Sequence, residues 1–195
     1  MIAACFGYRR DEEEKIRPLN DLQFAVRVDQ EGGLIRDYQI AQKYKDNGSL
    51  ERSYVTHRYY LEDAVFVAAV GCAEDQMAYK IGEALQCPYF QPFLGRRSIP
   101  LTADSYLGIR EGGPMDALTE LPWQAAKWYK KNNVNHVPVY ADLELIPSSV
   151  SKLRRDQVLS FSQVRGRAFQ YREESMTYID APYEEEHDAF SAMEV

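Results

Sequence analysis

The clearest strand signal of the chain is residues 23–28 (QFAVRV), which Gly32-Gly33 ends a few positions later. Residues 34–58 follow as a polar, tyrosine-rich excursion with Asn47-Gly48, a strong hairpin-turn signal, near its middle. Residues 59–70 are β-branched and aromatic, so we predict a strand there, and a buried one. The first half of the chain is therefore built around two strands joined by a long hairpin-like excursion.

Helices are expected on both sides of this centre. Residues 1–6 have the composition of the end of an apolar helix, with Gly7 as its C-cap. Residues 73–85 have helical spacing, and residues 105–109 suggest a short strand. The resulting order is helix, strand, excursion, strand, helix, strand. It predicts an α+β fold, a ferredoxin-like β-α-β-β-α-β module that lacks its first strand.

The second half carries weaker signals. Gly112-Gly113-Pro114 suggests a boundary, which divides the chain into a ferredoxin-like domain, residues 1–110, and a smaller β-rich region, residues 111–195. In that region we predict a helix over 123–131, a proline-containing edge strand over 137–144, and strands near 158–164 and 175–180.

The charge of the chain is unevenly distributed. The 195 residues are 45% hydrophobic and 27% charged, which is typical of a globular protein. The net charge is -7, and residues 171–195, with eight acids and one base, carry all of it. Residues 34–58 hold five bases and three acids, so the acidic total does not exclude a local surface for a polyanion.

Cysteine and histidine usage argues against disulfides and metals. The three cysteines have no CxxC spacing, and we interpret them as reduced thiols of a cytoplasmic protein. The three histidines lie far apart without ligand spacing, so we expect neither a metal nor another cofactor. No apolar run has the length of a membrane span, and we expect no membrane association.

The segment 91–102 (QPFLGRRSIPLT) has the composition of a loop that binds a polyanion. Its two prolines disfavour regular structure. Gly95 permits a positive φ or a close backbone approach to a ligand. Arg96 and Arg97 offer fork-shaped donors suited to phosphate oxygens, and Ser98 adds a hydroxyl.

Five motifs, in order and with matching gaps, resemble the CasD family of the RAMP superfamily. CasD is the Cascade subunit of type I-E CRISPR systems that holds the 5′ handle of the guide RNA (crRNA). The resemblance covers residues 1 to about 110 and returns faintly at 189–191. The residues that carry it are Ala4-Cys5-Phe6-Gly7 with Arg10-Asp11, Gln23-Phe24-Ala25-Val26-Arg27, Ile35-Arg36-Asp37-Tyr38, Arg58-Tyr59-Tyr60-Leu61 with Asp63-Ala64, and Pro92 to Leu101.

The resemblance implies a non-catalytic RNA-binding scaffold. Residues 95–98 match the family loop that lies against the crRNA handle, and 34–58 match a thumb that projects over the RNA and touches the neighbouring backbone subunit. Tyrosines of the thumb, among them Tyr44 and Tyr54, would stack on bases, and its cations would meet phosphates. The candidate RNA-binding residues are Arg36, Tyr38, Lys43, Lys45, Arg52, Arg58, Gly95, Arg96, Arg97 and Ser98.

The same resemblance implies protein partners. These are the Cascade backbone subunit and the large subunit that recognises foreign DNA, so that target DNA is contacted indirectly. Family members begin with a strand, a glycine-containing loop and the start of the first helix. Because these are lacking here, we expect that the sequence begins late or that its start codon is misassigned. We expect the acidic tail at a protein contact or in solvent, away from RNA.

Three alternatives stay open at this point. In the first alternative these side chains have no RNA ligand. The arginine pair then forms surface ion pairs with acids such as Asp104, and the thumb tyrosines pack at a subunit interface. A metal-independent endoribonuclease that processes precursor crRNA would use His57 with Lys45 or Tyr54 as acid-base groups. A protein-interaction module that never touches RNA is the third alternative.

Overall fold

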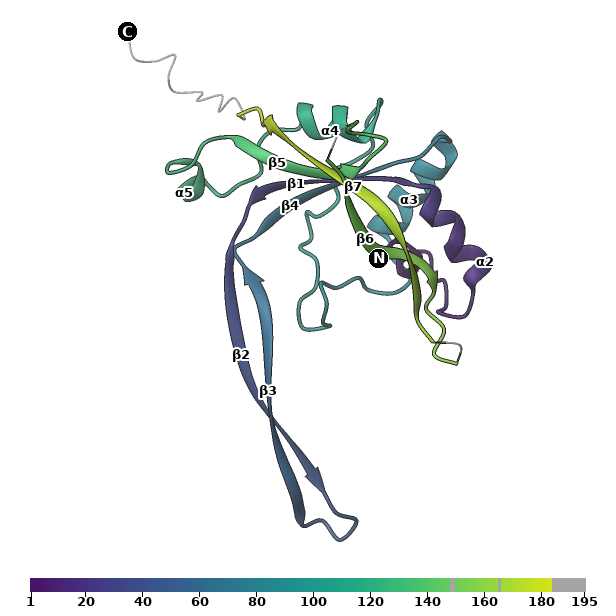
Figure 1. The fold of residues 1–195 in the computed structure, drawn as a ribbon, viewed down its shortest axis with the longest axis vertical. Helices are drawn as coiled ribbons and strands as arrows, with labels where there is room; N and C mark the ends of the chain where they lie inside the picture. Colours follow the sequence, from purple (N-terminus) through teal and green to yellow (C-terminus); the bar gives the residue numbers. More distant parts are fainter. Residues whose placement is uncertain (148–149, 165, 184–195) are drawn as a thin grey trace.

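The computed structural model describes residues 1–147, 150–164 and 166–183 (Figure 1). It is a mixed α/β fold in which antiparallel strands dominate, with a five-stranded sheet of order β4-β1-β5-β7-β6 and a separate two-stranded sheet, β2-β3. The helices are α1 (Ile2–Cys5), α2 (Glu13–Ile16), the 3-10 helix η1 (Arg17–Asp21), α3 (Asp75–Gln86), α4 (Pro114–Glu120) and α5 (Lys127–Lys130). The strands are β1 (Gln23–Gln30), β2 (Gly33–Tyr44), β3 (Leu50–Glu62), β4 (Val65–Gly71), β5 (His136–Asp142), β6 (Lys152–Ser160) and β7 (Ala168–Asp180).

The core lies on one face of the five-stranded sheet, where α4 packs against β1 and β4. Side chains alternate along a strand, so Ala25 of β1 points inward while Phe24 remains exposed. The buried cluster joins residues of β1, β4 and β5 to α4 and the residue after it: Ala25, Val67, Val139, Ala141, Leu118 and Leu121. The strand predicted at 23–28 is thus confirmed, and it is central to the core.

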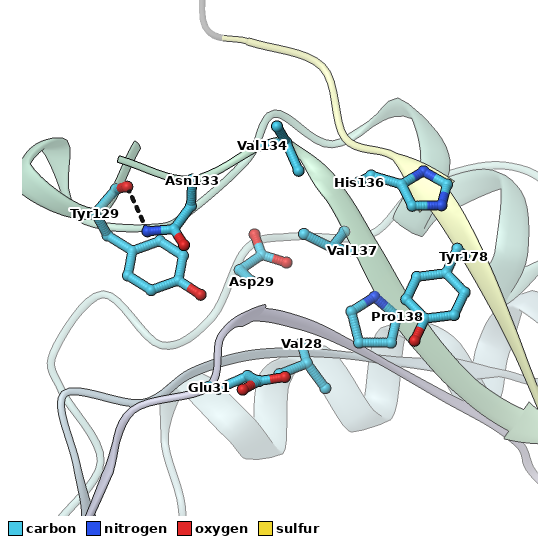
Figure 2. Close-up of a pocket in the computed structure, with 10 residues that line it drawn as sticks. All are labelled: Val28, Asp29, Glu31, Tyr129, Asn133, Val134, His136, Val137, Pro138 and Tyr178. Carbon is cyan, nitrogen blue, oxygen red and sulfur yellow. Dashed lines mark hydrogen bonds between the residues drawn. The ribbon is translucent and has the colours of Figure 1, made fainter. Parts of the chain in front are cut away.

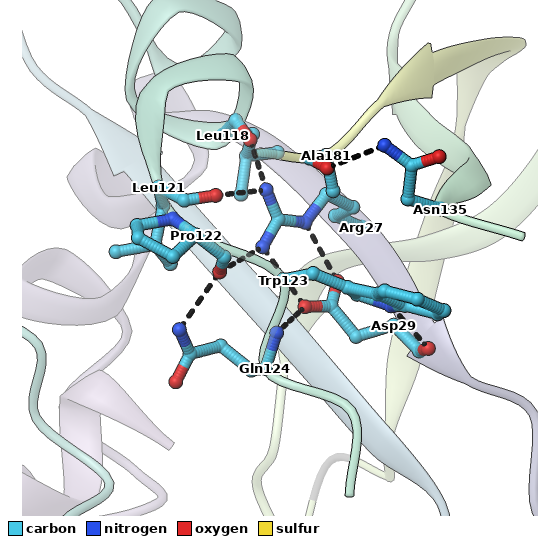
Figure 3. A network of polar contacts seen from close by, with 9 residues as sticks. All are labelled: Arg27, Asp29, Leu118, Leu121, Pro122, Trp123, Gln124, Asn135 and Ala181. Atoms are coloured by element: carbon cyan, nitrogen blue, oxygen red, sulfur yellow. Dashed lines mark hydrogen bonds and ion pairs between the residues drawn. The ribbon is translucent and has the colours of Figure 1, made fainter. Parts of the chain in front are cut away.

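A buried ion pair fixes the segment after α4 to this sheet (Figure 3). Arg27 and Asp29 point to the same face of β1 and are both fully buried, with Nε and Nη2 of Arg27 2.6 and 2.8 Å from the carboxylate oxygens. Arg27 also donates to the backbone carbonyls of Leu118, Leu121 and Pro122. Asp29 accepts the backbone N–H of Gln124 at 2.6 Å. Both charges are therefore satisfied inside the protein, as a buried pair requires.

The prediction of one buried strand over 59–70 is wrong. β3 ends at Glu62, β4 begins at Val65, and Asp63 between them has a φ of 53°. Val67 is the only residue of 59–70 that is buried. Aromatic and β-branched residues favour strands on exposed ribbons as well as in a core, so composition alone did not reveal the break.

The edge position predicted for the proline-containing strand is also wrong, because β5 lies between β1 and β7. Pro138 lies just outside residues 139–141, the stretch of β5 that pairs with β1. Pro138 therefore interrupts no hydrogen bond of the ladder between β5 and β1. A central strand tolerates this proline because the pairing of β5 with β1 ends at Val139, although β1 itself continues to Gln30.

Several weaker predictions differ from the structure. Residues 105–109 form no strand, and none of the described strands pairs with them. Within the helix predicted over 123–131, only Lys127–Lys130 is helical. The Gly112-Gly113-Pro114 sequence, which we interpret as a boundary, lies at the start of α4, where the backbone N–H of Gly113 donates to Asp116 at 2.9 Å. The strand expected near 175–180 is part of the longer β7, whereas of 158–164 only residues 158–160 are strand, at the end of β6.

The five-stranded sheet takes strands from both sides of residue 110, and the division into two domains stays a prediction. Within the described residues, no helix has both the length and the apolar composition that crossing a bilayer requires. Most of the acidic tail, from residue 184 onward, and the faint motif at 189–191 lie outside the described residues.

Candidate nucleic-acid interface

The arginine loop, residues 93–100, is a compact turn closed by a β-bridge between Phe93 and Pro100. The backbone N–H of Leu94 donates to the carbonyl of Ile99 at 2.8 Å, and the N–H of Ile99 donates to the carbonyl of Arg96 at 2.9 Å. The second bond closes a β-turn with Arg97 and Ser98 at its two corners. Gly95 has a φ of +81°, and a Cβ there would meet nothing within 4 Å. Glycine is therefore required here for backbone conformation.

Two helices hold the ends of the segment that carries this loop. Before the loop, the backbone N–H groups of Tyr89 and Phe90 donate to the carbonyls of Cys5 and Ala4 at the end of α1, at 2.9 and 3.2 Å. After it, Tyr106 lies so close to α3 that a Cβ at Gly82 would be 2.5 Å from its hydroxyl oxygen. The segment is thus attached to a helix on either side of the loop.

The loop lies beside the base of the β2–β3 hairpin (Figure 1). The guanidinium carbon of Arg96 is 5.7 Å from the centroid of the Tyr60 ring, within cation-π range. Arg97 and Ser98 are exposed. In the part of the chain that the structure describes, no acidic side chain lies within ion-pair distance of Arg96 or Arg97, Asp104 included. Both guanidinium groups are therefore available to an external anion.

The ladder between β2 and β3 divides the hairpin into two faces, because directly opposed residues point to the same side. The cationic face consists of Ile35, Asp37, Gln39, Ala41 and Lys43 of β2 with Arg52, Tyr54, Thr56, Arg58 and Tyr60 of β3. The apolar face consists of Leu34, Arg36, Tyr38, Ile40 and Gln42 with Ser53, Val55, His57, Tyr59 and Leu61. The ribbon itself twists along its length (Figure 1).

The register therefore separates the candidate thumb residues. Lys43, Arg52 and Arg58 share the cationic face, and through Tyr60 this face meets the arginine loop. Arg36 and Tyr38 lie on the apolar face, where the Tyr38 ring is 5.7 Å from the ring of His57. Lys45 lies in the turn at the tip, where its N–H donates to the carbonyl of Ser49 at 2.9 Å.

The positive charges of the cationic face are only partly compensated by acidic side chains of the protein. Lys43 forms an ion pair with Glu51 at 2.8 Å, and both side chains remain accessible to solvent. The guanidinium of Arg52 lies 5.7 Å from the ring centroid of Tyr54, which is a cation-π contact on the same face. An aromatic ring next to a cation offers a stacking surface and a phosphate donor at one place, which suits a single-stranded nucleic acid.

Sequence reasoning missed the contact of Tyr60 with Arg96, and with it Tyr60 as a candidate site residue. The residue was assigned to a buried strand, although it is partly exposed and pairs with Ile35 on the cationic face. The sequence did contain a signal for this position. Side chains alternate along a strand with a period of two residues, which places Tyr60 on the same side as Arg58.

The acid-base set of the ribonuclease alternative is not brought together. His57 pairs with Tyr38 on the apolar face, whereas Tyr54 points to the cationic face. Lys45 lies in the turn, which is about 20 Å from the His57 pair at the usual rise of a strand. Among the described residues, no three His, Cys, Asp or Glu side chains gather to hold a metal ion.

A small cavity of about 180 Å³ lies apart from this interface, between β1, β5 and β7 (Figure 2). At its rim the ring of His136 stacks on Tyr178, with centroids 5.1 Å apart, and its Nδ1 is 2.7 Å from Asp180. Asp29, which also lines it, is occupied by Arg27 and Gln124. No set of free polar groups converges among the residues that line this cavity, so nothing indicates that it binds a ligand.

The chain is similar to proteins of CRISPR systems. The sequence profile of the family described as "CRISPR-associated protein (Cas_Cas5)" matches residues 1–173. "CRISPR system Cascade subunit CasD" of Escherichia coli (strain K12) is 33% identical over 135 residues, which are 60% of this chain and 59% of that protein. The matched region therefore spans less than two thirds of the relative's length.

Two solved structures are also similar. A chain of a "CRISPR RNA-guided surveillance complex" superposes with a TM-score of 0.70 at 26% identity, covering 93% of this chain and 76% of the other. A structure titled "Crystal structure of Cas protein" gives a TM-score of 0.62 at 21% identity, with 94% and 80% coverage, and shows likeness of fold alone. Because the family profile matches most of its length, the chain belongs to the Cas5 family of CRISPR-associated proteins.

Proposed function

We propose that the protein is a non-catalytic crRNA-binding subunit of a Cascade surveillance complex, in which it grips the 5′ handle of the guide RNA. One observation carries the proposal. The contact between Arg96 and Tyr60 joins the arginine loop to the hairpin face that bears Arg58, Arg52 and Lys43. The likeness to a CasD subunit and to a chain of an RNA-guided surveillance complex supports the same role.

The RNA would lie between two jaws, the arginine loop and the cationic face of the hairpin. Arg97 and Ser98 at the corners of the turn would donate to phosphate oxygens, and Gly95 would let the backbone approach the strand. Tyr54 and Tyr60 would stack on splayed bases. Lys45 at the tip would reach a more distant phosphate. Because phosphates and stacking dominate such a grip, recognition depends on the splayed shape of the handle more than on base edges.

We also propose how the first part of the chain relates to a known fold. β1, β4 and α3 correspond to the second strand, third strand and second helix of a ferredoxin-like (RAMP) domain, with the β2–β3 hairpin as its thumb. We propose residues 1–110 as this domain and residues 111–195 as the β-rich region beside it. Docking onto the backbone subunit and the large subunit would connect the protein indirectly to target DNA, in the cytoplasm.

Salt-dependent RNA binding tests the grip. We would measure the affinity of the purified protein for labelled single-stranded RNA that carries the repeat-derived handle, over a series of salt concentrations. The variant is Arg96→Ala/Arg97→Ala, and the control is Arg9→Ala/Arg10→Ala, an exposed arginine pair far along the chain from the loop. Each lost phosphate contact removes about 0.7 from the slope of log affinity against log salt, so the loop variant should lose about 1.4.

Unchanged affinity and slope in the loop variant would refute the grip. Incubation of the same RNA with the protein in the absence of divalent metal tests the non-catalytic assignment. Cleavage that disappears in His57→Ala would replace the scaffold proposal with the endoribonuclease.

A further inference from the structure

The β6–β7 hairpin carries the most positive stretch of the chain. Residues 152–172 contain six bases and one acid, a net charge of +5 in a protein whose total is -7. Residues 34–58 of the other hairpin, by comparison, hold five bases and three acids. A concentration of positive charge in an acidic protein indicates a surface that attracts a polyanion.

The bases of β6 lie on the half of the strand that the helices leave uncovered. β6 is the last strand of the sheet, and Asn20 of η1 donates to the carbonyl of Val158 at 2.7 Å. Ser160, at the end of the same strand, donates its hydroxyl to Glu13 of α2. Residues 152–155 (KLRR) are all exposed, and three of these four are bases.

Ion pairs inside the protein occupy two of the positive charges. The Nε of Arg154 is 2.9 Å from the carboxylate of Glu174. Arg172 lies at 2.9 Å from Asp142 and at 2.8 Å from Asp156. These two arginines therefore serve the fold of the sheet.

The remaining bases that the structure describes have no acidic partner there. Lys152, Arg155 and Arg167 are exposed, and no carboxylate of the described residues lies within ion-pair distance of any of them. Glu173, the acid on the same face as Arg155, accepts the hydroxyl of Ser151 at 3.3 Å. Three full charges are thus available to an external anion.

Arg155 is placed beside an exposed aromatic ring. It lies directly across the ladder from Tyr171, which is 60% exposed, and its guanidinium carbon is 6.0 Å from the ring centroid. Its Nε donates to the carbonyl of Phe169 at 3.4 Å, which leaves both terminal nitrogens without a partner among the described residues. A charge alone suffices to protect an edge strand from pairing with another sheet. The exposed ring adds a stacking surface for a base, which such protection does not require.

We propose that the β6–β7 hairpin binds single-stranded nucleic acid, at a surface separate from the arginine loop and from the cationic face of the β2–β3 hairpin. Arg155 and Arg167 donate to backbone phosphates, and Tyr171 stacks on a base. Arg167 is four residues from Tyr171, about 13 Å at the rise of a strand, so the bound segment follows β7 toward the turn. The two hairpins extend toward the same end of the molecule (Figure 1). The second surface rests on the charge and contacts of β6 and β7 and does not depend on the handle grip.

Adjacent residues of β6 give a matched pair of variants. Arg155→Gln and Arg154→Gln remove the same charge from the same strand, but Arg154 is already paired with Glu174. Both would be made in the Arg96→Ala/Arg97→Ala protein, so that the arginine loop does not contribute. Binding of oligo(U) and of oligo(dT), each of about twelve nucleotides, would be measured over a salt series.

We expect Arg155→Gln to weaken binding at least threefold and to lower the slope of log affinity against log salt by about 0.7, with Arg154→Gln within about twofold. The chemistry of the surface is shared by unpaired RNA and unpaired DNA, and the two oligonucleotides separate them. A loss confined to oligo(U) assigns the surface to RNA, and a loss confined to oligo(dT) assigns it to DNA.

Photo-crosslinking locates the bound strand independently of affinity. Oligonucleotides that carry 4-thiouridine or 4-thiothymidine should form adducts with Tyr171 and not with Tyr178, which is also exposed but stacks on His136 beside Asp180. Equal effects of the two arginine variants on both oligonucleotides, or no adduct at Tyr171, would overturn the second surface. Unchanged handle binding by the loop variant would refute the grip alone, because the second surface is measured without the loop arginines.

Discussion

The buried Arg27–Asp29 pair makes Asp29→Ala the most informative perturbation of the fold. The substitution removes the acceptor of two Arg27 bonds, at 2.6 and 2.8 Å, and of the Gln124 N–H at 2.6 Å. Arg27 is fully buried and keeps only neutral partners, the carbonyls of Leu118, Leu121 and Pro122. Its charge is then uncompensated in a low-dielectric site.

Removing one member of a buried pair costs about 3–5 kcal/mol. The remaining carbonyls still accept from Nη1 and Nη2, whereas Nε–H loses its only acceptor, and we expect a cost of about 3–4 kcal/mol within this range. With a urea dependence of about 2 kcal/mol per molar, the midpoint should fall by about 1.5–2 M. A loss of that size is a large fraction of the stability of an ordinary domain, which is about 5–15 kcal/mol.

Equilibrium urea unfolding followed by tryptophan fluorescence measures the effect, since Trp123 donates its indole N–H to the carbonyl of Asp29 at 2.8 Å. Two further variants separate charge from packing. Asp29→Asn keeps an acceptor and should lose less than Asp29→Ala. Arg27→Met combined with Asp29→Ala removes both charges and should recover part of the loss. A midpoint shift below about 0.5 M for Asp29→Ala would show that solvent reaches Arg27, and would refute the reasoning.

Three further predictions concern the surface. Burial, with the charges of Asp75 and Glu74 adding to it, raises the pKa of the Cys72 thiol above its ordinary value of 9.0. At pH 8 iodoacetamide should therefore label Cys72 more slowly than the exposed Cys87, as peptide mass spectrometry would show, and equal rates in the folded protein would contradict this. Tyr60→Ala should weaken handle RNA binding about two- to fivefold by releasing Arg96, whereas Tyr60→Phe keeps the ring and should stay within twofold. Ala68→Lys places a charge on β4, an apolar strand at the edge of the sheet, and should reduce light scattering by concentrated protein relative to Gln39→Lys.

The elements that could be predicted from the sequence are those with a local cause. The Asn47-Gly48 turn within the tyrosine-rich segment 34–58 predicts a hairpin-like excursion, because the turn signal is local. The central position of β5 was missed, since whether Pro138 interrupts a ladder depends on where the pairing of β5 with β1 ends. The role of Arg27 was also invisible, because its partners include carbonyls more than 90 residues away along the chain.

The candidate site shows the same division between local and long-range causes. Residue type and spacing identified the arginine loop, because glycine, arginine and serine between prolines have a direct chemical meaning. Its attachment to α1 and α3 involves residues distant in sequence, such as Cys5 and Gly82, and no local pattern reveals it. Tyr60 was missed because one wrongly placed strand boundary assigned an exposed ring to the core.

The register of the hairpin is the property on which the division of its faces depends. Asn47 fixes the turn by accepting the N–H and the hydroxyl of Ser49 through its side-chain oxygen, at 3.1 and 2.8 Å. A slip of one residue between β2 and β3 would move every side chain of one strand to the opposite face. Arg58 would then lie on the same face as Leu34 and no longer on the face that meets the arginine loop. Each face would mix cations with aliphatic groups. The composition of the hairpin would be unchanged, yet neither face would suit one kind of partner. The few hydrogen bonds at the tip of the ribbon therefore determine which side chains lie next to Arg96 at its base.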